Sequence, residues 1–248
     1  MLYLSERDRS DLEKSGLTDE QMILTGHFSA NEETAERLVG MKLKGLVFSY
    51  TDPNGKPYPR SDGKPFHRIK PDYGEGKSDR PKYLSPKGEG CRPYFSKLYT
   101  DWKNAITSTK IELWETEGEK KGDCGCANGL AVIAFGGVDG WVDSRGRQDE
   151  NDKSKSLLEL KVIDYKNRRV NLCFDSDIIE KPQVQLALAK RAIALKTLGA
   201  IPYLVLLPNE IDGSKNGLDD FIFRHGVVAL QTLAHEALKV ETKEAKDE

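Results

Sequence analysis

The segment that decides the fold is residues 111–118, with the sequence IELWETEG, in which apolar and polar side chains alternate up to a carboxylate and a glycine. A second alternating segment, residues 170–174 (VNLCF), is followed directly by Asp175, Ser176 and Asp177. Period-two alternation predicts β-strands. If both strands belong to an open parallel sheet, their carboxyl ends meet at the crevice where such sheets place their sites. Converging carboxylates suit Mg²⁺, so a magnesium-dependent phosphoryl-transfer site is the first hypothesis.

The bulk composition indicates a polar protein that can still bury a core. The chain has 248 residues, of which 38% are hydrophobic and 31% charged, enough for one large domain or a small domain packed on a larger one. No segment approaches the roughly 20 apolar residues of a membrane span, and the N-terminus lacks a signal-peptide pattern. The four cysteines are too few and too scattered for a disulfide scaffold, so a cytoplasmic location is expected.

Charge is distributed unevenly along the chain. Residues 52–110 hold 13 Lys and Arg against 7 Asp and Glu, whereas residues 1–51 hold 6 against 9 and residues 111–248 hold 19 against 24. A basic, aromatic-rich segment beside an acidic one favours a nucleic-acid-binding part next to a metal-binding part. A solvated lysine-rich loop region would give the same numbers, and charge alone does not separate the two interpretations.

The N-terminal half is expected to form two parts. Residues 1–44 are a helical lead-in, with a short helix over residues 8–15, a helix start at residues 18–21 and a helix over residues 29–39 that Ser29 would cap. Residues 45–108 are a small, basic, β-rich subdomain in which short strands alternate with strong turn signals. Its expected strands and turns are residues 45–50, 52–55, 61–63, 66–70, 81–86 and 92–95. Tyr83, Tyr94 and Phe95 could form its core or stack on bases.

Residues 109–240 alternate between strand and helix signals, which predicts an α/β fold with a mainly parallel sheet flanked by helices. After residues 111–118, Gly122 and Gly125 weaken the expected crossover helix. The remaining expected elements are a strand at 130–135, a surface loop at 139–156, a short helix at 157–160, a helix at 182–198, a strand at 201–207, an element that starts at 217–221 and a C-terminal helix at 227–240. Residues 241–248 would form a charged tail or linker.

The candidate acidic residues each have a structural alternative. Glu117 precedes Gly118, and this dipeptide occurs by chance in many chains. Asp175 and Asp177 stand close together after a strand, where a divalent cation would relieve their repulsion, although a turn or helix cap also favours Asp and Ser. Asp219, in the segment KNGLDD at residues 215–220, is a further candidate ligand, and Asp219 or Asp220 could equally cap a helix.

Three other sequence features bear on which kinds of binding site the chain could contain. Lys120 and Lys121 could reach phosphates or simply form a solvated helix face. Cys124 and Cys126 lack a matching Cys or His pair, which disfavours a zinc site. The chain has no Gly-x-x-x-x-Gly-Lys-[Ser/Thr] motif, which excludes a P-loop ATPase.

The order of these motifs resembles the Toprim domain that bacterial-type DNA primases, topoisomerases and certain nucleases share. Glu117-Gly118 at one strand end and Asp175-x-Asp177 at a following one carry the resemblance. Tyr50-x-Asp52-x-x-Gly55, the strand with Arg68, PKYLSP at residues 81–86 and Leu98-Tyr99 stand in the order expected for the small basic subdomain that precedes Toprim in those primases. TEGEKK at 116–121 with GLDD at 217–220 is most similar to the Toprim-like domains of plasmid, phage and integrative-element replication proteins. The resemblance spans roughly residues 40–225.

The resemblance implies roles for individual residues. Glu117 would be an acid/base or metal ligand, and Asp175 and Asp177 would hold Mg²⁺, or Mn²⁺ in its place, with Asp219 as a further ligand. Metal ions of this kind neutralise phosphate charge while basic side chains position the strand. Basic side chains would contact the phosphates of template or nucleotide; these are Arg68, Lys82, Lys120, Lys121 and Lys215.

The function implied is Mg²⁺-dependent nucleotidyl transfer, most simply primer synthesis on single-stranded DNA during replication of a mobile element. Nucleotides would be the second substrate, and a replicative helicase, in the same or another chain, a partner. Two alternatives stay open. One is a Toprim nuclease that uses the same carboxylates to cleave DNA, and the other is a non-catalytic nucleic-acid-binding module of a replication helicase.

Overall fold

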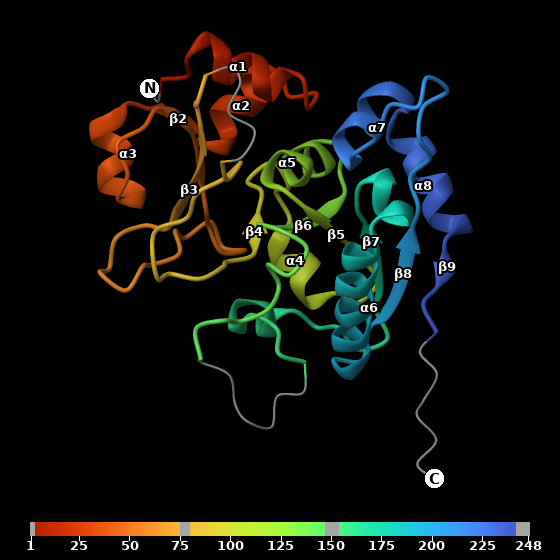
Figure 1. Ribbon diagram of the computed structural model, residues 1–248. Helices are drawn as coiled ribbons and strands as arrows, with labels where there is room; N and C mark the ends of the chain where they lie inside the picture. Colours follow the sequence, from red (N-terminus) through yellow and green to blue (C-terminus); the bar gives the residue numbers. More distant parts are fainter. Residues whose placement is uncertain (1–2, 75–79, 147–153, 242–248) are drawn as a thin grey trace.

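The computed structural model describes residues 3–74, 80–146 and 154–241. Within these ranges the strands form a three-stranded sheet and a six-stranded sheet, and Figure 1 shows the first at the left and the second at the centre and right. The described helices are too short or too polar to cross a membrane. The tail expected at residues 241–248 lies outside the described residues apart from Glu241, as does the middle of the loop expected at 139–156.

The first sheet is antiparallel and has the order β1-β2-β3. Its strands are β1 (Phe28–Ala30), β2 (Gly45–Ser49) and β3 (His67–Pro71). Helices α1 (Glu6–Glu13), α2 (Asp19–Thr25) and α3 (Glu32–Val39) surround it. The segment expected to be a helical lead-in therefore also supplies a strand of this sheet.

The start of α3 differs from the expectation that Ser29 caps it. Ser29 lies in β1, where its hydroxyl donates to Asp8 at 2.5 Å, and the Asn31 side chain accepts the Thr34 backbone N–H at 2.9 Å instead. Asn and Ser are both good N-caps. Pairing of β1 with β2 uses residues 28–30 and moves the start of the helix to Glu32.

The second sheet has the order β4-β6-β5-β7-β8-β9. The central strands β5 (Leu113–Glu117), β6 (Ala131–Phe135), β7 (Arg169–Cys173) and β8 (Ile201–Val205) are parallel. The edge strands β4 (Tyr94–Phe95) and β9 (Leu238–Lys239) are antiparallel to their neighbours. The predicted α/β fold with a mainly parallel sheet flanked by helices is confirmed.

Several helices flank this sheet (Figure 1). They are α4 (Trp102–Thr107), α5 (Glu119–Ala127), α6 (Pro182–Thr197), α7 (Leu218–His225) and α8 (Val227–Glu236), with the 3₁₀ turns η1 (Leu158–Val162) and η2 (Ser176–Glu180). The predicted C-terminal helix ends earlier than expected. Ala237 is extended, and the chain then pairs with Tyr203 and Leu204 as β9.

The expectation that glycines weaken the crossover helix was wrong, because Gly122 and Gly125 let α5 pack closely on β6. A Cβ at Gly122 would lie 2.9 Å from the Ala134 Cβ, and a Cβ at Gly125 would lie 2.4 Å from the Val132 Cγ2. The intrinsic helix cost of glycine, about 1 kcal/mol per residue relative to alanine, is therefore offset by packing that a larger residue would prevent.

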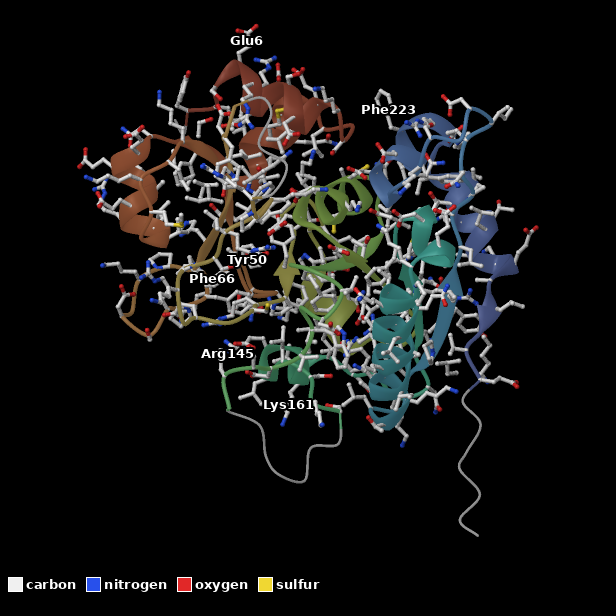
Figure 2. All side chains as sticks on the ribbon, in the orientation of Figure 1. Glu6, Tyr50, Phe66, Arg145, Lys161 and Phe223 are labelled. Carbon is white, nitrogen blue, oxygen red and sulfur yellow. The ribbon has the colours of Figure 1, made fainter. Side chains whose placement is uncertain are left out.

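The larger of two hydrophobic clusters runs through both sheets, and Tyr50 and Phe66 lie in its interior, whereas Phe223 projects from α7 at the surface (Figure 2). Tyr94 and Phe95 are buried in this core and Tyr83 packs partly buried against it, which favours the core role over the base-stacking role for Tyr94 and Phe95. The Arg191 guanidinium forms a buried ion pair with Glu115, at 2.5 and 2.7 Å.

A buried polar network connects the N-terminal segment with α5. The Asp123 carboxylate, which is fully buried, accepts hydrogen bonds from the Ser96 hydroxyl at 2.5 Å and the Tyr94 hydroxyl at 2.7 Å. The His27 Nε2 lies 2.9 Å from the same carboxylate. Because each partner satisfies the buried charge, this network joins the two sheets into one packed unit.

Candidate functional site

Glu117 and Asp175 lie at the same edge of the second sheet. Glu117 is the last residue of β5, and Asp175 follows β7 and opens η2. Strands β5 and β7 are parallel neighbours, so their carboxyl ends coincide. Gly118 then turns the chain into α5 with a φ of 96°, a backbone conformation that favours glycine.

Lys121, on the first turns of α5, forms an ion pair with Asp175, with 2.5 Å between the Lys121 Nζ and the Asp175 Oδ1. Burial acts to lower the pKa of Lys121, but the Asp175 carboxylate, together with smaller contributions from Asp219 and Glu117, outweighs this effect and raises the pKa. Lys121 therefore remains a cation in the midst of the carboxylates.

Gly217 allows Lys121, Asp175 and Asp219 to approach one another. A Cβ at Gly217 would lie 2.6 Å from the Lys121 Cε, 2.9 Å from the Asp219 Oδ1 and 3.3 Å from the Asp175 Oδ1. Its φ of −86° is open to any residue, so glycine is required here for space and not for backbone conformation.

Asp219 and Asp220, either of which was expected to cap α7, have different partners in the structure. The Asp220 carboxylate accepts the Gly217 backbone N–H at 3.0 Å and so caps the helix. The Asp219 carboxylate accepts a 2.6 Å hydrogen bond from the Ser15 hydroxyl instead. This leaves Asp219 directed toward the N-terminal segment and the pocket.

Burial raises the pKa of Glu117, and although the Lys121 ammonium opposes this effect, the Asp175 charge reinforces it. A carboxyl group with a raised pKa can hold or release a proton closer to neutral pH than an ordinary glutamate. Glu117 thus has the electrostatic character of an acid/base residue.

These groups line a single pocket of about 380 Å³ between the two sheets. Of the nine predicted site residues, all of which the structure describes, six line this pocket: Lys82, Glu117, Lys120, Lys121, Asp175 and Asp219. The other described lining residues are Asp11, Lys14, Ser15, Lys70, Tyr83, Gly118 and Asp220. The six residues come from four segments that the sequence singled out, residues 81–86, 116–121, 175–177 and 215–220, and Lys70 comes from a fifth, residues 66–70.

The remaining predicted residues do not line the pocket. Asp177 pairs with Lys181 at 2.5 Å and with Lys215 at 2.8 Å. Hydrogen bonds from these two ammonium groups lower the pKa of Asp177. Asp177 and Lys215 thus neutralise each other, and neither is among the residues that line the pocket.

Arg68, expected to contact phosphates, is held inside the protein. Its guanidinium donates to the Glu119 carboxylate at 2.7 Å and to the Ser85 hydroxyl at 3.1 Å, and lies over the Tyr83 ring. The Tyr50 hydroxyl donates to the same Glu119 oxygen at 2.6 Å. Although burial opposes it, the Glu119 charge raises the pKa of Arg68. Arg68 therefore ties β3 to α5.

The contribution of α1 to the site was not predicted from the sequence. The Asp11 carboxylate forms ion pairs with two ammonium groups: its oxygens lie 2.6 Å from the Lys70 Nζ and 3.0 Å from the Lys120 Nζ. Burial acts to raise the pKa of Asp11, but these two cations outweigh it and hold the pKa below its ordinary value. Ser15 reaches the pocket from the turn after the same helix. Such long-range contacts leave no local pattern, which is why sequence reasoning missed them.

The described lining of the pocket offers carboxylates to a hard divalent cation, but not a complete set of metal ligands. Across the described ranges, no three Asp, Glu, His or Cys residues form a group that could hold a metal by themselves. Glu117, Asp175 and Asp219 nevertheless line one cavity, and proteins usually hold Mg²⁺ through one or two carboxylates together with substrate phosphates. A zinc site is disfavoured because Cys124 is a buried thiol whose pKa burial raises to about 12.

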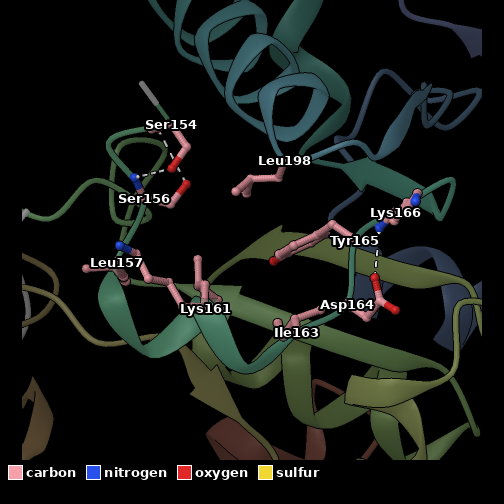
Figure 3. Close-up of a pocket in the computed structure, with 10 residues that line it drawn as sticks. Ser154, Ser156, Leu157, Lys161, Ile163, Asp164, Tyr165, Lys166 and Leu198 are labelled. Carbon is pink, nitrogen blue, oxygen red and sulfur yellow. Dashed lines mark hydrogen bonds between the residues drawn. The ribbon is translucent and has the colours of Figure 1, made fainter. Parts of the chain in front are cut away.

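A separate cavity of about 480 Å³ lies beside η1 (Figure 3). Ser154, Ser156 and Leu157 lie on one side of it, and Tyr165 and Leu198 on the other. None of the nine predicted site residues, all within the described ranges, lines this cavity. The carboxylate pocket is therefore the candidate functional site.

Comparison with known proteins identifies the family. The model of the family DUF3854, described as a domain of unknown function, matches residues 101–229. The chain belongs to the DUF3854 family. Among curated proteins none matches it significantly.

Two solved structures are similar to this DUF3854 protein in fold. The Aquifex aeolicus primase, with its zinc-binding and RNA polymerase domains, superposes with a TM-score of 0.63 at 14% identity, over 95% of this chain and 57% of that chain. The RNA polymerase domain of the Mycobacterium tuberculosis primase DnaG superposes with a TM-score of 0.60 at 13% identity, over 92% of this chain and 75% of that chain. The fold is therefore primase-like, and this chain spans little more than half the length of the first of these structures.

Proposed function

We propose that this DUF3854 protein is a primase-like nucleotidyltransferase that acts on single-stranded DNA and nucleotides with Mg²⁺ or Mn²⁺. One observation carries the proposal: Glu117, Asp175 and Asp219 line a pocket together with Lys82, at the carboxyl edge of a sheet in a primase-like fold. Phosphoryl transfer depends on positioning and on charge neutralisation, and this pocket offers groups for both.

The carboxylates and the lysines of the pocket would have different roles in this reaction. Asp175 and Asp219 would hold the divalent ion, with Glu117 as a further ligand where it does not act as proton acceptor, and the bound ion would neutralise phosphate charge. Lys82, Lys120 and the other lysines of the pocket would bind phosphates of nucleotide or strand. Glu117, with its raised pKa, could accept the proton of an attacking hydroxyl. Asp177 and Lys215 would join the site only if substrate separates their present ion pair.

Several finer assignments belong to the same proposal. The Toprim resemblance, the context of a mobile element and a helicase partner rest on the sequence motifs. The division into a basic subdomain at residues 45–108 and a catalytic domain at residues 109–240 is likewise a proposal. Within it, β4 pairs with β6 and so adds residues 94–95 to the larger sheet.

The test is incubation with single-stranded DNA, labelled nucleotides and Mg²⁺ or Mn²⁺, with products resolved on one gel. Glu117→Gln and Asp175→Asn should abolish template-dependent products, while Glu236→Gln, an exposed position on α8, should retain them. Cleavage of the DNA without synthesis, lost in the same two variants, would replace the proposal with a Toprim-type nuclease. Neither activity, with DNA binding intact, would favour the non-catalytic binding module.

A further inference from the structure

At the edge of the pocket that α1 contributes, one carboxylate lies between two lysines. Both oxygens of the Asp11 carboxylate accept hydrogen bonds from the Lys70 Nζ, at 2.7 and 2.6 Å. The Lys120 Nζ lies 3.0 Å from the Asp11 Oδ1 and 3.1 Å from the Asp11 backbone oxygen. One ammonium group from β3 and one from α5 therefore converge on the same carboxylate oxygen, and all three residues line the pocket.

The single charge of Asp11 does not compensate both lysines. Burial lowers the pKa of Lys70, and the Lys120 charge adds to this effect, which the hydrogen bond to Asp11 opposes but does not reverse. The three side chains are only 17–27% exposed, so solvent ions screen their charges incompletely. This edge of the pocket therefore favours an anion that carries more than one negative charge.

A phosphate group meets this requirement better than a carboxylate does. A phosphate monoester carries a charge of about −1.5 to −2 at pH 7 and offers three acceptor oxygens, which matches two converging ammonium groups. Lysine binds phosphate as a point charge on a flexible stem, so both ammonium groups can adjust to a ligand larger than a carboxylate. The Asp11 carboxylate thus occupies the position that a phosphate would take between these lysines.

Helix α1 keeps this carboxylate at the pocket. Leu12, the next residue, is fully buried in the core, and Ser15 in the turn after α1 donates a 2.6 Å hydrogen bond to Asp219. A tethered group of this kind competes with a free ligand at an effective concentration that can reach about millimolar. Rotation of the short Asp11 side chain would be enough to free both lysines, so the helix need not leave its place.

We infer that Lys70 and Lys120 form a phosphate subsite, and that the Asp11 carboxylate of α1 occupies this subsite and competes with phosphate for it. This inference rests on the proposed function and adds a regulation of the same pocket. A phosphate of the substrate would displace Asp11 and pair with both ammonium groups. Lys70, which was not among the nine predicted site residues, thus joins Lys120 as a phosphate ligand.

Binding of inorganic tripolyphosphate to the full chain, measured by isothermal titration calorimetry in metal-free buffer, tests the inference. Asp11→Asn removes the competing charge but keeps the size of the side chain, and it should bind tripolyphosphate roughly tenfold more tightly than wild type. Lys70→Met in the Asp11→Asn background should abolish this gain. Glu13→Gln removes the same charge from an exposed residue of α1 that pairs with Arg9, and it should change the affinity less than about twofold.

Three results would overturn the inference: Asp11→Asn that binds tripolyphosphate no more tightly than wild type, Glu13→Gln that gains as much as Asp11→Asn, or a gain that Lys70→Met does not remove. Thermal unfolding of each variant identifies any that fails to fold. If Asp11→Asn is one of these, Lys70→Met and Lys120→Met in the wild-type background decide. Each should weaken tripolyphosphate binding at least about fivefold, and unchanged binding by either would overturn the inference. Failure of the proposed function is separate, because it appears as Asp11→Asn that binds tripolyphosphate tightly while wild-type protein incorporates no nucleotide.

Discussion

Ser15 and Asp219 are separated by 204 positions in the chain, and the Ser15 hydroxyl donates a 2.6 Å hydrogen bond to the Asp219 carboxylate. This contact joins the turn after α1 to the first turn of α7 at the edge of the pocket. Residues 101–229, which the family model matches, include Asp219 but not Ser15. The pocket is therefore completed by a segment that lies outside the matched region.

Lys82→Gln should weaken binding of single-stranded DNA. Lys82 lines the pocket, and loss of one phosphate contact reduces the slope of log K against log salt concentration by about 0.7 for a single strand. Fluorescence anisotropy across a salt series measures this slope. Lys166→Gln, at an exposed position that lines the separate cavity, is the control and should leave the slope unchanged. An equal effect of both substitutions would mean that binding is a diffuse charge effect.

Arg68→Met should reduce the free energy of unfolding by about 3–5 kcal/mol, because it leaves the buried Glu119 carboxylate without its cation. Urea denaturation measures the loss. Arg68→Met combined with Glu119→Met should cost less than Arg68→Met alone, since no charge then remains buried. If Arg68→Met keeps full stability but loses DNA binding, Arg68 contacts phosphate directly, as the sequence motifs implied.

The raised pKa of Glu117 predicts a pH-dependent effect on stability. The folded protein binds this proton more tightly than the unfolded chain, whose carboxyl has the ordinary pKa of 4.5. The contribution of Glu117 to stability is therefore complete below that value and is lost as the pH rises through the folded-state pKa. Glu117→Gln should match wild type at about pH 4 and exceed its stability at about pH 7, in denaturation measured at both values.

Asp177 serves as a control for that experiment, because its pKa is shifted in the opposite direction and its contribution to stability should change with pH in the opposite sense. Hydrogen bonds from Lys181 and Lys215 lower its pKa below the ordinary 3.8. Its contribution to stability is present above that value and lost as the pH falls through the folded-state pKa. Asp177→Asn should therefore destabilise the protein at about pH 7 and have a smaller effect in acid. If Glu117→Gln is also destabilising at neutral pH, its carboxylate is stabilised by the lysines and our assignment of its pKa is wrong.

Gly217→Ala should cost about 1–3 kcal/mol of stability through overpacking, because the new methyl group would lie 2.6 Å from the Lys121 Cε. The same substitution in a Lys121→Ala background should cost much less, since the shortened side chain vacates that space. A thermal and urea double-mutant cycle measures the difference. Equal costs in the two backgrounds would show that the methyl group meets Asp219 or backbone and not Lys121.

The larger sheet was predictable because its strands carry strong local signals. Alternation over residues 111–118 and 170–174 and the apolar run at 130–135 correspond to β5, β7 and β6. The edge strand β9 has two residues, too few for any periodicity to register. The edge strand β4 lies within the expected residues 92–95, but it pairs with β6 in the larger sheet and not with the small subdomain. The helix α5 was underestimated because the benefit of its glycines lies in the contact with β6, which no local propensity contains.

The candidate site was predictable in part for the same reason. Glu117 and Asp175 end neighbouring strands, and strand ends can be located from alternation. Asp177 lies only two residues further, but the turn η2 directs it to Lys181 and Lys215 instead. The partners from the N-terminal segment, Asp11 and Ser15, reach the pocket only through tertiary packing.

The buried network around Asp123 contains residues from both inside and outside the region that the family model matches. Asp123 lies within residues 101–229, whereas His27, Tyr94 and Ser96, which hold its carboxylate, lie before that region. A fragment cut at the limits of the family match would leave the buried Asp123 carboxyl group without these partners. We therefore expect residues 101–229 alone to be less stable than the same residues in the full chain, because residues outside the matched region complete the interior of the matched one.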